Sequence, residues 1–195
     1  EAYMTGAWTN FRITGGSASD SFLTLKGNAS TDISLLLASR LNGTVTVGAS
    51  ADILTIEMTG NSTGTIDLEG SITNLVSLTI SEGTIESSSS ISTKATVVGG
   101  TLRTLGTSAY PTIEIDTGGS VDYRSSGTIT TLNIFDGVFS SRDNQTAGFT
   151  ITNADVHSGG RMLLDSALNN ATVTNAIEML GGDASFAVGS TISLG

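Results

Sequence analysis

Carboxylate side chains are the residues of this chain whose type and spacing come closest to a catalytic arrangement. Glu114 and Asp116 alternate along one short segment, and Asp122 and Asp136 lie one and two bends further on. Glycoside cleavage needs two carboxyl groups roughly 5 to 10 Å apart, one of them with a raised pKa. Successive turns of a stacked β structure could supply that separation. Acids that face outward from a solvated sheet also keep a protein soluble, and we favour this second interpretation.

Other residues that could take part in catalysis do not gather around these acids in the sequence. The basic residues that a calcium-dependent lyase would use as a base are scattered singly, at Arg103, Arg124, Arg142 and Arg161. The single histidine, His157, stands beside a bend and has no Ser or Cys elbow with which to form a triad. Glycine-rich pieces such as VVGGTL lack the lysine and the spacing of a phosphate loop. We therefore expect no enzymatic activity, no metal and no cofactor.

Composition narrows the classes of partner. The 195 residues include 8 basic and 18 acidic side chains, which give a formal net charge of -10. A nucleic-acid binder needs a basic stripe to meet phosphate, and an anionic membrane attracts basic segments, so we expect neither partner. The chain contains no cysteine, which excludes disulfides and thiolate metal sites. No apolar run approaches the ~20 residues that span a bilayer.

Regularly spaced glycines indicate which elements position all these side chains. Eight of them recur 17 to 23 residues apart, and the residue two positions after each one is apolar. These anchor glycines are Gly43, Gly64, Gly83, Gly100, Gly119, Gly137, Gly160 and Gly182. The apolar residues that follow them are Val45, Ile66, Ile85, Leu102, Val121, Phe139, Met162 and Ala184. A repeat of this length with alternation inside each unit is typical of a solenoid.

Each unit is predicted to hold two short strands, one before and one after the bend at the anchor glycine. Equivalent residues of stacked parallel turns lie above one another at the ~4.8 Å strand spacing, so the apolar position forms one internal column. We predict an all-β fold, a single-stranded-type parallel β-helix or β-solenoid of about eight rungs. An antiparallel sandwich or jelly roll is the alternative, although it would show turn signals every 8 to 12 residues. The apolar run ISLLLASRL before Gly43 is also expected to be a strand.

Residues 1–20 differ from the rest of the chain and are predicted to form an N-terminal cap or contact segment, followed by a solenoid domain over residues 21–195. Three aromatic residues crowd into the first eleven positions of a chain that is only 5% aromatic. A solenoid leaves its terminal turn with an open edge, which a cap or a partner must cover. The residues expected to contact a partner are Tyr3, Trp8, Phe11 and Arg12.

Three repeat units also carry a family resemblance. The units TITTLNIFDGVF, SITNLVSLTISEGTIES and TVTNAIEMLGGDASF resemble the repeats of β-helical proteins from the virions of tailed bacteriophages, and the resemblance covers residues 43–195. It implies a non-enzymatic capsid decoration or cement protein on the virion surface, which bridges subunits of the major capsid protein and associates with copies of itself. Autotransporter passengers and bacterial adhesins have similar repeats. The alternative is therefore a receptor-binding or glycan-binding module of a tail fibre, tailspike or surface adhesin, at an extracellular or cell-surface location.

Overall fold

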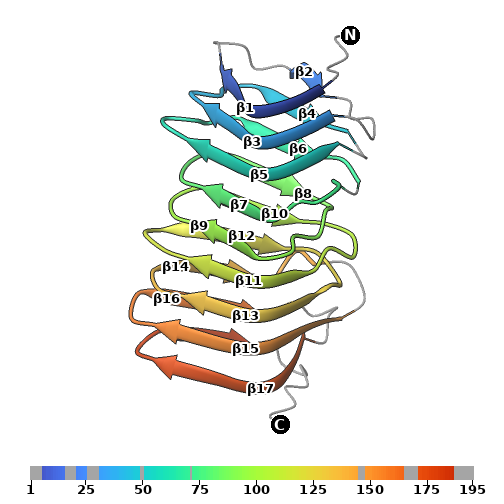
Figure 1. The fold of residues 1–195 in the computed structure, drawn as a ribbon. Coiled ribbons are helices and arrows are strands. Elements are labelled where there is room, and N and C mark those ends of the chain that lie inside the picture. Colours follow the sequence, from blue (N-terminus) through green and yellow to red (C-terminus); the bar gives the residue numbers. More distant parts are fainter. Residues whose placement is uncertain are drawn as a thin grey trace.

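The chain is a stack of turns in which two parallel β-sheets enclose one apolar core (Figure 1). The computed structural model describes residues 6–15, 21–25, 31–48, 51–70, 72–144, 148–164 and 171–186. All regular secondary structure in these residues is β-strand, and each sheet contains nine strands. We call the sheet of odd-numbered strands sheet A and the sheet of even-numbered strands sheet B.

Each turn contributes one strand to each sheet. Sheet A contains β1 (Gly6–Thr14), β3 (Thr31–Ser39), β5 (Asp52–Thr59), β7 (Ser77–Ile80), β9 (Lys94–Val97), β11 (Tyr110–Ile115), β13 (Thr128–Ile134), β15 (Phe149–His157) and β17 (Ala171–Leu180). Sheet B contains β2 (Ser21–Leu25), β4 (Thr44–Val47), β6 (Thr65–Leu68), β8 (Thr84–Ser87), β10 (Thr101–Thr104), β12 (Gly119–Tyr123), β14 (Gly137–Ser140), β16 (Gly160–Leu164) and β18 (Asp183–Phe186).

The predicted parallel β-solenoid is confirmed. Neighbouring strands within each sheet pair in parallel along the whole described stack, from β1 to β17 and from β2 to β18. An antiparallel sandwich is thereby excluded. The apolar run before Gly43 forms β3, as expected, and β1 and β2 extend the stack ahead of the units that the anchor glycines define.

The predicted apolar column lies in the core of sheet B. Strand register places its members next to one another from turn to turn, as in the pairs Val45 with Ile66 and Leu102 with Val121. All are fully buried from Val45 to Met162, and only Ala184, on the last strand, is partly buried. Burial stabilises a large aliphatic side chain by roughly 1.5 to 3 kcal/mol, so repetition of this position supplies much of the stability of the stack.

The anchor glycines mark places where backbones of successive turns meet closely. A Cβ atom on Gly64 would collide with the carbonyl oxygen of Gly43, and one on Gly137 would collide with that of Gly119. Gly137 also has a φ of 151°, a conformation that side chains disfavour. The glycine spacing therefore records a steric requirement that recurs once in each turn.

A bend interrupts the alternation in sheet A. In β5 and β13, two consecutive residues face outward between buried ones, for example Leu54 and Thr55 between Ile53 and Ile56. Strands β7 and β9 are only four residues long and begin after this bend. The segments that precede them, 72–76 and 90–93, lie outside the named strands, although Thr73 forms an isolated parallel bridge with Asp52 and backbone hydrogen bonds still join both segments to neighbouring turns. They shape the candidate site described below.

Aromatic and small polar side chains fill the core in the middle of the stack. Tyr123 packs against Phe149, with ring centroids 4.9 Å apart, and against Phe139 at 5.6 Å. Tyr110 lies edge-on to Tyr123 at 6.4 Å. The two tyrosines differ in their hydroxyl groups: Tyr123 donates a hydrogen bond of 2.9 Å to the Gly127 carbonyl, whereas the buried Tyr110 hydroxyl lies near Ser87 and Ser108 without a hydrogen bond of good geometry to any described residue. Desolvation raises the pKa of both.

Candidate functional site

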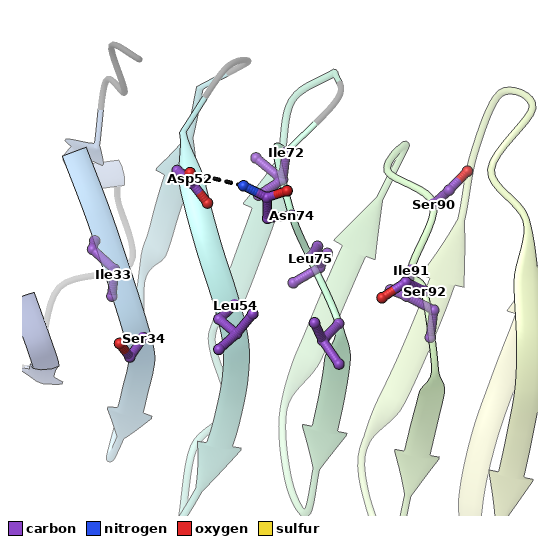
Figure 2. Close-up of a pocket in the computed structure, with 11 residues that line it drawn as sticks. Ile33, Ser34, Asp52, Leu54, Ile72, Asn74, Leu75, Ser90, Ile91 and Ser92 are labelled. Atoms are coloured by element: carbon purple, nitrogen blue, oxygen red, sulfur yellow. Dashed lines mark hydrogen bonds between the residues drawn. The ribbon is translucent and has the colours of Figure 1, made fainter. Parts of the chain in front are cut away.

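An open groove with a volume of about 670 Å³ crosses four turns on the sheet A side of the stack (Figure 2). It lies where β3 and β5 already run as regular strands before the bend of sheet A, whereas the corresponding segments before β7 and β9 are irregular. Its floor consists of nearly buried aliphatic side chains: Ile33, Ile72, Leu75 and Ile91. The groove therefore has an aliphatic floor, and its lining residues follow one another across successive turns.

Polar groups line the rim of this groove. Asn74 donates a hydrogen bond of 2.9 Å from Nδ2 to Oδ2 of Asp52, and this bond joins two turns, as Figure 2 shows. Ser90 accepts a hydrogen bond of 2.9 Å from the Ala109 amide, which leaves its own proton available. Ser34 and Ser92 add exposed hydroxyl groups. Such a rim offers hydrogen-bond donors and acceptors, and the Asp52 carboxylate gives it one formal charge.

The exposed side chain of Leu54 stands among these polar groups, with 44% of its surface accessible. Recessed aliphatic surface beside hydroxyl, amide and carboxylate groups suits a neutral, hydroxylated ligand, because ligand sites combine apolar contact with a few orienting polar groups. No motif in the sequence marks this groove. Its residues follow no repeat, since the groove lies where the strands of two adjacent turns, β7 and β9, begin late.

The acidic residues first considered for catalysis are spread over different parts of the stack. Glu114 lies on the outer side of sheet A, where Lys94 forms an ion pair with it at 2.9 Å. Asp122 lies on the outer side of sheet B, so the two carboxylates face opposite directions. Asp116 and Asp136 occupy the bends between the sheets, where Asp116 Oδ1 accepts a hydrogen bond from the Thr117 amide.

The interpretation of the basic residues as singly scattered is wrong for two of them. Arg103 forms ion pairs of 3.0 Å with both Glu86 and Asp122. Arg124 reaches the same Asp122 at 2.6 Å and Asp143 at 3.2 Å. Hydrogen bonding to Glu86, and then to Asp122, raises the pKa of Arg103, and hydrogen bonding to Asp122 raises that of Arg124. We call these five residues the charge ladder of sheet B.

Part of the charge ladder carries a signal in the sequence. Glu86, Arg103 and Asp122 each stand three positions after an anchor glycine, and strand register makes them direct neighbours. Asp67, on the neighbouring strand β6, pairs in register with Glu86, and no cation lies between these two acids. Burial, followed by repulsion from Glu86, raises the pKa of Asp67. Half-exposed ion pairs contribute about 0 to 1 kcal/mol each, so the charge ladder adds little to stability compared with the buried core.

The predicted partner-contact residues lie on the terminal strand of sheet A, as far as the structure describes them. Trp8 is 43% exposed and meets Phe11 edge-on, with ring centroids 6.4 Å apart. Phe11 is half-buried against the core, and Arg12 is exposed. Tyr3 lies outside the described residues. Whether these side chains contact a partner stays a prediction.

A second set of exposed apolar residues lies at the opposite end of the stack. Met179 and Leu180 on β17 and Phe186 on β18 are 45%, 50% and 41% exposed. Beside Leu180, His157 stacks on the ring of Phe135 at 4.6 Å, so the single histidine makes an aromatic contact on the outer side of sheet A.

Comparison with protein families, with curated protein sequences and with solved structures yields no match to this chain. No group of three or more potential metal-binding side chains is found within the described ranges. The described residues contain no helix that is long and apolar enough to cross a membrane.

Proposed function

We propose that this chain is a non-enzymatic structural protein of a bacteriophage virion, which decorates the outer surface of the capsid and bridges its subunits. The observation that carries this proposal is the in-register stack itself, whose terminal strand β1 presents Trp8, Phe11 and Arg12. A stack with a continuous core keeps these side chains in fixed positions relative to both sheets. The resemblance of its repeats to those of phage virion proteins supports the placement on a capsid.

The composition of β1 is that of a protein-binding segment. Tryptophan and arginine are enriched among the residues that dominate binding energy at interfaces. Trp8 is held by its edge contact with Phe11, so little side-chain freedom is lost when a partner covers it. The major capsid protein is the proposed partner, and the acidic outer faces, within a net charge of -10, keep the rest of the surface solvated.

The test is co-sedimentation of the purified protein with empty capsids of the phage that encodes it. We expect binding that saturates at a fixed ratio to the capsid subunit. Trp8→Ala should weaken this binding at least tenfold without a change in Tm. Leu54→Ala removes a side chain of nearly equal exposure, 44% against 43%, from a different surface and should bind normally. Absence of saturable binding, or equal effects of the two variants, would contradict the proposal.

A glycan-binding module of a tail fibre, tailspike or adhesin is the second candidate, and the groove favours it. A row of hydroxyl groups beside the Asp52–Asn74 pair could bind successive hydroxyls of an extended sugar chain. On an array of neutral and acidic glycans, Leu54→Ala and Asp52→Ala should then abolish binding, whereas Trp8→Ala should leave it unchanged. The same three variants thus give opposite patterns for the two functions.

A further inference from the structure

We propose that copies of this chain associate head to tail, with β1 of one copy pairing in parallel with β17 of the preceding copy. These two strands are the terminal strands of sheet A at opposite ends of the stack (Figure 1). Each has one edge that no described strand covers, and unpaired edges of this kind are ready to bind another strand. The inference concerns copies of the chain alone, so it does not depend on the proposed capsid role.

Strand register carries the argument. Cα pairing from strand to strand links Arg12 on β1, through positions on each intervening strand, to Asp155 on β15 and Glu178 on β17. Arg12 and Glu178 therefore occupy the same outward column at opposite ends. If a second copy continues the stack, its Arg12 lies beside Glu178 of the first copy.

The charges at the two ends are complementary. Glu178 stands next to Asp155, and neither carboxylate has an ion-pair partner among the described residues, just as Arg12 at the other end has none there. Like charges on adjacent strands repel, and an incoming guanidinium relieves that repulsion. Within one copy, Arg103 already lies between two acids of neighbouring turns at 3.0 Å. The proposed contact would form one such pair across the interface, with Arg12 beside Glu178 on one side and Leu37 of its own copy on the other.

The apolar columns also continue from one copy into the next. Phe11 shares a core column with Ile177, and Ile13 shares one with Met179. Met179 is 45% exposed, although its neighbour in this column, Val156, is fully buried. A second copy would therefore bury the side chains that the last turn leaves open.

An irregularity in β17 limits the contact without preventing it. The register between β15 and β17 shifts after Val173, where β17 has one extra residue before Ala176. This bulge coincides with the bend of sheet A, at which consecutive residues already face outward. The pairing segment is thus 177–180 of one copy with 11–14 of the next. In sheet B, β18 and β2 occupy the corresponding terminal positions.

Charge exchange tests the pairing directly. Mass photometry and sedimentation velocity should show concentration-dependent oligomers of the full chain. Arg12→Glu and Glu178→Arg should each weaken association at least tenfold, and the double variant, or an equimolar mixture of the two single variants, should restore it. Glu69→Arg makes the same charge change as Glu178→Arg on an exposed residue in the interior of the stack and should leave association unchanged. Tm values of all variants verify folding.

A cross-linking experiment tests the register, because the chain has no native cysteine. Thr14 and Leu180 are exposed and stand two positions after Arg12 and Glu178, so the proposed register places them side by side. Thr14→Cys and Leu180→Cys should therefore be joined by a short bis-maleimide only when the two variants are mixed. The product should be a heterodimer and nothing longer. A monomer at all concentrations, failure of charge exchange to restore association, or cross-linking of Thr14→Cys with itself would overturn the proposal. Capsid binding is measured separately, so either proposal can fail alone.

Discussion

Substitution of Ile85 by aspartate is expected to prevent folding. Ile85 is fully buried on β8, and its column neighbours Ile66 and Leu102 are fully buried as well. Loss of the buried aliphatic group costs about 1.5 to 3 kcal/mol, and an unpaired carboxylate in an apolar interior costs several kcal/mol more. The sum is comparable with the entire stability of a domain, roughly 5 to 15 kcal/mol.

Two companion variants make this prediction measurable. Ile85→Ala should fold and lose about 2 to 5 kcal/mol, as judged by urea unfolding followed by circular dichroism. Glu86→Ser, one residue away on the outer side, should change stability by less than ~1 kcal/mol, because Arg103 keeps its ion pair with Asp122 and the repulsion of Asp67 is relieved. Equal tolerance of the Ile85 and Glu86 variants would refute the proposed register of the core.

Three further predictions concern buried hydroxyls, a surface acid and an anchor glycine. Tyr123→Phe should cost about 0.5 to 1.5 kcal/mol in urea unfolding, because a hydrogen bond is lost. Tyr110→Phe should cost less than this, because its hydroxyl lies near Ser87 and Ser108 without a hydrogen bond of good geometry to any described residue; the opposite order would contradict this. The raised pKa of Asp67 means that its contribution to stability is fully present below its unfolded pKa, near 3.8, and is lost as the pH rises through the folded value. Asp67→Asn should therefore raise Tm at pH 7 and have no effect near pH 3, and a gain that persists at pH 3 would exclude an electrostatic cause. Gly119→Ala should lower stability by about 1 to 3 kcal/mol, because its Cβ would collide with the backbone of the preceding turn; an unchanged unfolding midpoint would show that the backbone adjusts freely.

The β-solenoid could be predicted because the same residue types recur at the same positions of each repeat. Close backbone contact requires glycine once in each turn, and the core requires an apolar residue two positions later, so Gly64 and Ile66 appear together in the sequence. The same logic extends to the charge ladder: Glu86, Arg103 and Asp122 hold one repeat position and become neighbours. Arg124 also contacts this set, because it donates a hydrogen bond from Nε to Asp122, two residues earlier. The repeat pattern gives no signal for such a contact.

The groove could not be predicted, since it depends on differences between turns. Ser77 begins a strand that is four residues long, while the preceding strand, from Asp52, has eight. Sequence alternation around Leu75 and Ile91 resembles that of the longer strands, and only the packing of neighbouring turns decides where the ladder stops. Glu114 and Asp122 show that closeness in the sequence does not imply closeness in space: both face outward, as favoured from the sequence, but they lie on opposite sides of the stack.

The parallel ladders described above also determine how the molecule responds to force. Hydrogen bonds between strands join one turn to the next, so they point along the axis of the stack (Figure 1). A pull on the two ends of the chain acts on these ladders in series and detaches the terminal turns first, because each turn contacts only its neighbours. Compression, in contrast, presses together backbones that already lie at the ~4.8 Å strand spacing. The rod thus resists shortening and yields to tension one turn at a time.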